Sequence, residues 1–203
     1  GVHSLPYSLY GPIMFGTDVA GDRIEVVKRL LRNLGEAGIP ILGYQWNPRG
    51  LVPMRTRSDR PIRGEAKATE FDLDAVDAPF ERVDTIEREY TEEEFWENYE
   101  RFVEEVVPVA EEAGVRMALH PVDPPEIEQL GGIPRLFRNV EAFERAMDIV
   151  PSHYHGLKLC LGCFSQLGED IPALIHRFGE RDRIVFVHFR DVVGTVPQFH
   201  ETF

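Results

Sequence analysis

The sequence lacks several features that would assign it to a class of protein at once. It contains no GxGxxG or GxxxxGK motif, the glycine-rich turns that hold phosphate after a strand, so we do not predict a nucleotide-binding fold. It is also poor in basic residues, with 22 Lys and Arg against 35 Asp and Glu and a formal net charge of -13. Because nucleic-acid binding needs clustered positive charge, we predict no nucleic-acid partner.

Long apolar runs are missing as well. No stretch approaches the roughly 18 consecutive apolar residues that predict a membrane span. The first twenty residues also lack the charged and apolar regions of a signal peptide. We therefore expect a cytoplasmic protein with no membrane partner.

Cysteine is scarce, with only Cys160 and Cys163 in the segment "KLCLGCFS". Because there is no second cysteine pair, a four-cysteine zinc site is excluded. Cys163 lies beyond the end of an expected strand and has no independent partner, so we interpret it as structural. A redox CxxC pair normally lies at a helix start, and we predict no helix start here.

Four segments have the apolar spacing of amphipathic helices: 21–36, 91–113, 139–150 and 170–179. In the clearest of them, Thr91 and Glu94 form a capping box, and aromatic residues recur at helical intervals. We interpret this aromatic stripe as a core face.

Each helix leads into a short apolar run of strand length, at 38–46, 114–121, 156–162 and 183–192. Nearly continuous apolar strands that alternate with helices indicate an α/β fold with a buried parallel sheet. An open doubly wound sheet and a closed barrel both fit this pattern. The absence of a phosphate turn and the polar residues at strand carboxyl ends favour a TIM-type (β/α)8 barrel.

The barrel should be incomplete in this chain. Eight strand and helix units take about 250 residues, whereas these 203 residues contain four clear units, or five if "GPIMFG" (11–16) is an early strand. We predict a single domain over residues 1–203. Since an incomplete barrel exposes unpaired strand edges, we expect either a longer native chain or association, most simply as a homodimer.

A long loop insertion is predicted at about 47–91, where no element can be assigned. Five arginines fall in it: Arg49, Arg55, Arg57, Arg60 and Arg63. Such loops often form lids or binding loops, and arginine pairs well with carboxylates, so the cluster suggests anion recognition. An ordinary solvated loop with surface arginines explains the pattern equally well.

Three predicted strands end with a side chain that can bind a metal: His120, Cys160 and His188. They are separated by 40 and 28 residues, about one strand, loop and helix unit each, so they can converge at one mouth of a barrel. Two imidazoles and a thiolate suit a divalent ion such as iron(II) or zinc. Alternatively, each is a buried structural residue.

Further polar residues lie close to these strand ends. Asp123 follows His120 by three positions, and Arg190 follows His188 by two, on the same face if the strand continues. Gln198, His200 and Glu201 come near the end of the sequence, whereas His3, His153, His155 and His176 have no comparable placement. We interpret these four histidines as surface or core residues.

The motifs taken together resemble the mannonate dehydratase family. They occur in the order "GYQWNP", "RTRSD", "ALHPVDPP", "GGIPRLFRNVEAFERAMD", "GLKLCLGCFSQLGEDIPALIHRFGERDRIVFVHFRDV" and "FHETF". The resemblance implies a barrel lyase of hexuronate catabolism that removes water from D-mannonate to give 2-keto-3-deoxy-D-gluconate. It also implies a divalent metal cofactor, iron(II) or manganese(II), and a sugar acid as the small-molecule partner.

Carried over by position, the resemblance places the metal ligands at His120, Cys160 and His188, and Arg190 and His200 near the substrate. We predict that Arg190, with Arg55 and Arg57 from the loop, binds the substrate carboxylate. We predict that His200 or Asp123 transfers a proton.

The sequence departs from the family pattern at two places. Val122 stands where the family has the first of two aspartates, and the family's further metal-binding aspartate and catalytic tyrosine would follow Phe203. Two other functions stay open: a metal-dependent sugar isomerase or epimerase, which shares the barrel and the metal, and a non-catalytic dehydratase-like protein that binds a sugar acid, which these departures suggest.

Overall fold

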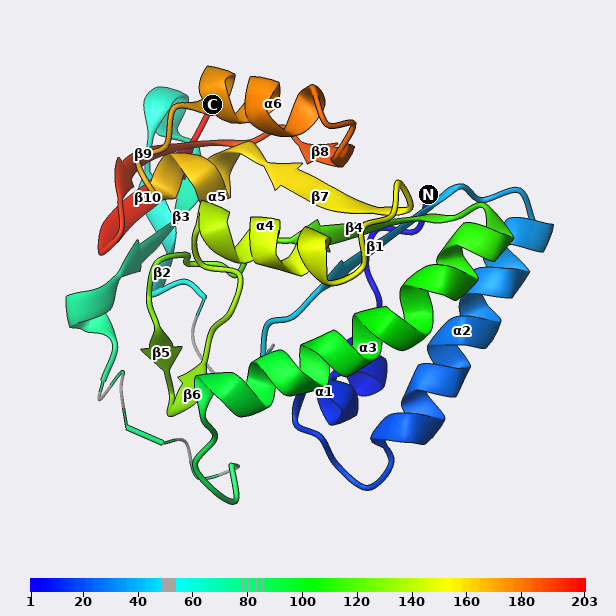
Figure 1. Ribbon diagram of the computed structural model, residues 1–203. Coiled ribbons are helices and arrows are strands. Elements are labelled where there is room, and N and C mark those ends of the chain that lie inside the picture. Colours follow the sequence, from blue (N-terminus) through cyan, green and yellow to red (C-terminus); the bar gives the residue numbers. More distant parts are fainter. Residues whose placement is uncertain (49–53, 78, 80, 83, 85) are drawn as a thin grey trace.

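The strands of the four predicted units form one parallel sheet in the computed structural model, in the order β1-β4-β7-β8 (Figure 1). They are β1 (Ile41–Gln45), β4 (Arg116–His120), β7 (His155–Cys160) and β8 (Ile184–His188). The structure describes residues 1–48, 54–77, 79, 81–82, 84 and 86–203. The expected parallel α/β sheet is confirmed, and among the described residues it stays open instead of closing into a barrel.

The four predicted helices are also present, with small shifts at their ends. They are α2 (Ala20–Glu36), α3 (Glu92–Ala113), α4 (Val140–Ile149) and α6 (Ile171–Gly179). Their starts have local causes: the capping box of Thr91 and Glu94 opens α3, and the side chains of Asn139 and Asp170 cap α4 and α6. In Figure 1, α2 and α3 run side by side below the sheet.

The two faces of the parallel sheet differ in chemistry. Alternate residues of its strands belong to the hydrophobic core that the helices share, among them Leu42, Tyr44, Met117, Leu119, Leu157 and Leu159. The residues between them include His120 and Lys158, which line a cavity. Because side chains alternate along a strand, one face is packed under helices and the other carries the polar groups.

A second, antiparallel sheet lies beside the carboxyl ends of the first, in the order β2-β3-β10-β9. Its strands are β2 (Arg57–Pro61), β3 (Lys67–Asp72), β9 (Asp191–Thr195) and β10 (Gln198–Thr202), with 3-10 turns η1 (Arg63–Glu65) and η2 (Leu73–Ala75) flanking β3. Phe71 and Phe199 stack at its centre, with their ring centroids 5.7 Å apart.

Part of the segment 47–91 is therefore folded, contrary to the prediction of a loop without elements. Strand β3 gains order from β10, far along the sequence, and no local pattern reveals such a pairing. Arg49 of the arginine cluster lies outside the described residues. The assignment of residues 1–203 to a single domain stays a prediction.

Three further local predictions are wrong. The run "GPIMFG" lies in and just after helix α1 (Tyr7–Met14), because Tyr10, Ile13 and Met14 are buried at helical spacing. The predicted strand 183–192 divides after His188, and its end belongs to β9 of the other sheet. The predicted strand 156–162 ends at Cys160, where helix α5 (Leu161–Gln166) begins.

The remaining elements are β5 (Gln129–Leu130) and β6 (Ile133–Pro134), which pair with each other. Among the described residues, no helix combines the length and the apolar composition needed to cross a bilayer.

Candidate metal centre

The register of the parallel sheet places four polar side chains at one edge. Gln45 pairs with His120 across β1 and β4, and Cys160 pairs with His188 across β7 and β8. All four are the last residues of their strands. The carboxyl ends of parallel strands are where barrel proteins assemble their sites. The structure therefore brings together the three predicted metal ligands.

The two histidines face each other. His120 Nε2 lies 3.1 Å from His188 Nδ1, and His120 Nδ1 lies 2.6 Å from the Pro121 carbonyl oxygen. If Nδ1 of a neutral His120 donates to that carbonyl, its Nε2 has a free lone pair directed at His188. Two nitrogens that each bind one ion at about 2.1 Å lie roughly 3 Å apart, so this pair fits a shared metal.

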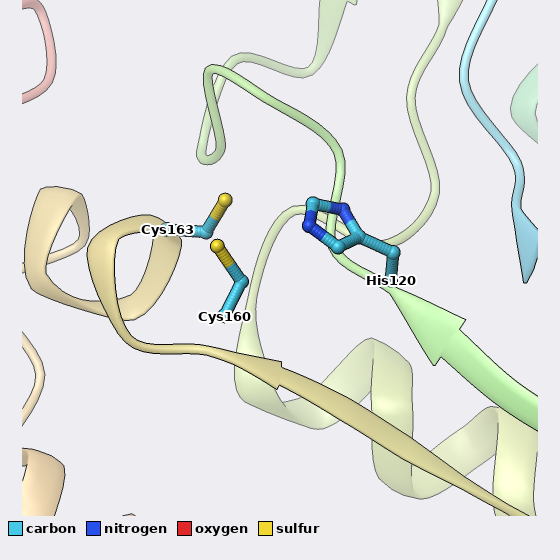
Figure 2. Close-up of side chains that lie close together, drawn as sticks. All are labelled: His120, Cys160 and Cys163. Atoms are coloured by element: carbon cyan, nitrogen blue, oxygen red, sulfur yellow. The ribbon is translucent and has the colours of Figure 1, made fainter. Parts of the chain in front are cut away.

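A pair of cysteines lies beside these histidines. Cys160 is the N-cap of α5 and Cys163 lies in its first turn, with both side chains buried. Their sulfur atoms and a ring nitrogen of His120 all lie within 4.8 Å of one another, and Figure 2 shows the three side chains around one space. The prediction that no helix starts here is wrong, and Cys163 does have a partner.

The two thiols differ in acidity. A hydrogen bond from Cys163 lowers the pKa of Cys160 most, burial opposes this, and His120 and His188 lower it further, so that the pKa is far below that of an ordinary thiol. The same hydrogen bond and burial raise the pKa of Cys163 well above its usual value. Cys160 is therefore the more acidic thiol of the pair, and the thiolate is the form in which cysteine binds metals.

Two arginines and two carboxylates form a charged cluster next to the two cysteines. Arg55 donates Nη1 and Nη2 to the two oxygens of Asp123, each at 2.9 Å, and Nη2 to Glu201 at 2.7 Å. Arg190 Nη1 donates to Asp123 at 3.0 Å and lies 3.7 Å from both cysteine sulfurs. Burial raises the pKa of Asp123, but Arg55 and Arg190 together outweigh it and keep this carboxyl ionised.

Between these groups lies a cavity of about 210 Å³. It is lined by His120, His188, Arg55, Asp123, Arg190 and also by Gln45, Lys158, Glu201 and His3, with Ser4 and Met54. It is smaller than the roughly 300–1,000 Å³ pockets that hold drug-sized ligands, so a small polar molecule is the suitable occupant.

Two predicted site residues lie away from this cavity. Arg57 is 49% exposed and pairs with Asp59. On β10, Phe199 and Glu201 share a face and contact Arg55, whereas His200 lies on the opposite face near Arg60. Burial and the charge of Arg60 lower the pKa of His200.

The sequence analysis gave no role to six of the described residues that line the cavity, among them His3, Lys158 and Glu201. His3 and Glu201 reach it only through long-range pairing, and the interpretation of His3 as a surface or core residue did not foresee this place. Lys158 had a local signal, because a lysine inside an apolar strand, two positions before Cys160, shares its face. Its side chain is buried, and its Nζ donates to the His3 carbonyl at 2.6 Å.

Val122, where the sequence departs from the family pattern, is joined by its backbone to the segment that contains a buried arginine. The Val122 side chain is fully buried, and its backbone N–H donates to the Phe137 carbonyl at 2.9 Å. Two residues before Phe137, Arg135 is fully buried, and its guanidinium has no hydrogen-bond partner among the described residues. Burial, partly offset by Asp123 and Cys163, lowers the pKa of Arg135 to about 10.

The donor set itself suits a metal ion. It combines two imidazoles with a thiolate, which bind iron(II) and zinc readily, whereas manganese(II) prefers oxygen ligands. Fold and site together define the class: a β/α-barrel type of protein with a candidate metal centre at the carboxyl ends of its strands. The fit of donors and spacing supports one divalent ion at this place.

Comparison with known proteins identifies the family. Residues 7–203 match the family model for D-mannonate dehydratase (UxuA), and the chain belongs to this family. The mannonate dehydratase of Streptococcus pneumoniae (strain 70585) is 31% identical over 225 residues, which cover 99% of this chain and 60% of the relative. That of Streptococcus suis (strain 05ZYH33) is 32% identical over 203 residues, which cover 88% of this chain and 54% of the relative.

Solved structures agree on the fold. The mannonate dehydratase of Streptococcus suis serotype 2 superposes with a TM-score of 0.83 at 32% identity, over 94% of this chain and 55% of that one. The IOLI protein, whose structure holds a zinc atom, shares the fold at a TM-score of 0.50 and 17% identity, over 85% of this chain and 45% of that chain. The barrel fold class is confirmed. The chain spans 60% and 54% of the length of the two dehydratases described above.

Proposed function

We propose that this chain belongs to a metal-dependent dehydratase that converts D-mannonate to 2-keto-3-deoxy-D-gluconate in hexuronate catabolism. The observation that carries the proposal is the convergence of His120, Cys160 and His188 at one edge of the sheet, in a chain of the mannonate dehydratase family. The reaction breaks the C2–H and C3–OH bonds and releases one water, and the enol that results becomes the 2-keto product.

His120, Cys160 and His188 would hold the metal, with iron(II) favoured over manganese(II) by the thiolate and the imidazoles. When bound, a divalent ion acts as a Lewis acid that lowers the cost of removing the proton beside the substrate carboxylate. Arg190, within 3.7 Å of the Cys160 sulfur, favours the thiolate form of this ligand.

The charges around the cavity support binding of an anionic sugar acid. Three cations line it, Arg55, Lys158 and Arg190, against the two carboxylates Asp123 and Glu201. We assign the substrate carboxylate to Arg190, whose Nη2 has no hydrogen-bond partner among the described residues, whereas every N–H group of Arg55 already has an acceptor. Asp123 holds both arginines in place. Asp123 is then a positioning residue, since a carboxyl with a lowered pKa is a poor proton donor at neutral pH.

Other parts of the sequence-based hypothesis remain predictions. His200 as a proton-transfer residue and Arg57 as a substrate ligand lack support from the cavity geometry, because neither is among the described residues that line it. The cytoplasmic location and the homodimer also remain predictions.

The direct test measures the product. Metal-free protein is incubated with D-mannonate, with and without iron(II) or manganese(II), and the mixture is examined by mass spectrometry. The proposal expects a metal-dependent product lighter by the mass of one water. A metal-dependent product of unchanged mass would instead indicate an isomerase or epimerase. A protein that binds the metal but leaves D-mannonate unchanged contradicts the proposed reaction.

Two variants test the ligand assignment. Cys160→Ser and His120→Asn should each lower metal affinity and turnover by about 100-fold or more, beyond the roughly 10–100-fold effect of an outer-shell change. The matched control is His176→Asn, because the His176 side chain is 80% exposed and lies on α6. Metal content by elemental analysis is the readout, and full occupancy in Cys160→Ser would refute the assignment.

A further inference from the structure

The N-terminal segment forms an extra parallel edge beside β1. Val2 N donates to Ile41 O and Gly43 N donates to Val2 O, both at 2.8 Å, and Leu5 N donates to Gly43 O at 2.9 Å. Gly43 makes this approach possible, because a Cβ there would lie 2.0 Å from the His3 carbonyl oxygen. The backbone at His3 is thereby fixed against the sheet.

This pairing brings the side chain of His3 to β8, 185 residues away in sequence. His3 Nε2 lies 2.9 Å from His188 Nε2. The two rings are nearly parallel, with centroids 4.9 Å apart and planes inclined by 14°, so the two Nε2 atoms meet edge to edge. Lys158 anchors the same segment through the His3 carbonyl. His3 therefore touches the nitrogen of His188 that points away from His120.

Metal binding by His188 would decide which of its two ring nitrogens carries the proton. If His188 uses Nδ1 as a metal ligand beside His120, its neutral imidazole carries the proton on Nε2. That N–H can donate to His3 Nε2, which accepts. Metal-binding histidines usually donate their second N–H to an acceptor that sets the tautomer and the ring orientation.

We propose that His3 is a positioning residue of the metal centre, accepting a hydrogen bond from His188 that fixes the His188 ring so that its Nδ1 is directed at the ion. This inference rests on the proposed function, because it takes His188 as a metal ligand. It goes beyond that function by giving the N-terminal segment a part in metal affinity.

The test uses cobalt(II) as a spectroscopic substitute for the native ion, with the whole chain. Wild-type protein should show thiolate-to-cobalt charge-transfer absorption and bind one ion. His3→Leu removes the acceptor and the aromatic ring and should weaken cobalt binding about 10-fold, the low end of outer-shell effects because His3 is exposed. Its spectrum at saturation should match the wild type, since all ligands remain.

Two further variants separate the role of His3 from general damage. His3→Gln keeps an acceptor and should bind cobalt more tightly than His3→Leu. Gly43→Ala replaces no side chain of the ligand set. Its added methyl group displaces the His3 backbone and also meets Lys158 Nζ, which anchors His3, and the variant should weaken binding as His3→Leu does. The exposed His176→Leu is the control and should bind like the wild type.

The outcomes distinguish the two proposals. If the wild type binds no cobalt, the metal centre of the proposed function is wrong, and this inference falls with it. If the wild type binds but His3→Leu and Gly43→Ala bind equally well, only the role of His3 is refuted. A changed saturated spectrum in His3→Leu would make His3 a ligand and would also overturn a positioning role.

Discussion

Arg55 and Arg57 lie two positions apart and carry the same charge, but they have different surroundings. The Arg55 side chain is 17% exposed and bonds Asp123 through two parallel hydrogen bonds, with Glu201 as a second partner. Arg57 pairs with an exposed carboxylate on the surface. A forked pair away from water is far stronger than a solvated one, so only Arg55 is expected to affect both stability and the site.

Replacing each arginine by methionine tests this difference. Arg55→Met should lower the free energy of unfolding by about 2–3 kcal/mol, because charge-assisted hydrogen bonds to a buried carboxylate are lost. Arg57→Met, the matched control, should change it by less than about 0.5 kcal/mol. Urea unfolding followed by circular dichroism measures both. Equal effects would show that Arg55 is no more important to the fold than a surface arginine.

At the scale of elements, a buried polar cluster joins β1, β7 and α3. The Tyr44 hydroxyl lies 2.8 Å from His155 Nε2 and 2.9 Å from the Tyr99 hydroxyl, so each of the three elements contributes one side chain. Burial, with a smaller effect of Arg183, lowers the pKa of His155 to about 3. Folding therefore keeps this imidazole neutral at pH values where the unfolded chain protonates it.

The sign of the resulting pH dependence follows directly. Between about pH 3 and 6.5 the unfolded chain binds a proton that the folded chain does not, so stability rises with pH across this window and is lost as the pH falls. His155 contributes on the order of a few kcal/mol to the change in unfolding free energy over this window. His155→Gln should remove this contribution and make the unfolding free energy less dependent on pH. Urea unfolding at a series of pH values measures it.

The control for this experiment is His176→Gln, on the exposed surface of α6. The unfolding free energy of this variant should depend on pH as that of the wild type does. An unchanged slope in His155→Gln would mean that this cluster does not oppose protonation of the buried histidine.

At the scale of the whole molecule, the cavity lies where the two sheets meet. The parallel sheet contributes His120, Lys158 and His188, and the antiparallel sheet contributes Glu201. Their ligating and charged atoms come together only in the folded chain. An ion held by β4, β7 and β8 would therefore bind the native state in preference to the unfolded state.

Metal binding should then raise the melting temperature. One ion present at about 100 times its dissociation constant adds roughly 2.7 kcal/mol to the stability. Iron(II) or cobalt(II) should produce this shift in a thermal scan and a chelator should reverse it, whereas calcium, which prefers oxygen ligands, should have no effect. Cys160→Ser should lose most of the shift. A full shift in that variant would show that the ion binds elsewhere.

Much of the parallel sheet could be predicted because its signals are local. Helical periodicity, the Thr91 capping box and short apolar runs each lie within one segment, and the three strand ends follow from chain spacing. The helix α1 was missed because a short apolar run fits a helix and a strand equally well.

Sequence alone determined the elements of the parallel sheet and the residues His120, Cys160 and His188 at its carboxyl edge. Only the tertiary structure decided that Glu201 and not His200 faces Arg55, because the pairing of β10 with β3 sets which face is turned inward. It also brought His3 to His188, through hydrogen bonds between the N-terminal segment and β1. Strand pairing between distant segments depends on register and on backbone hydrogen bonds, which leave no periodic mark in the sequence.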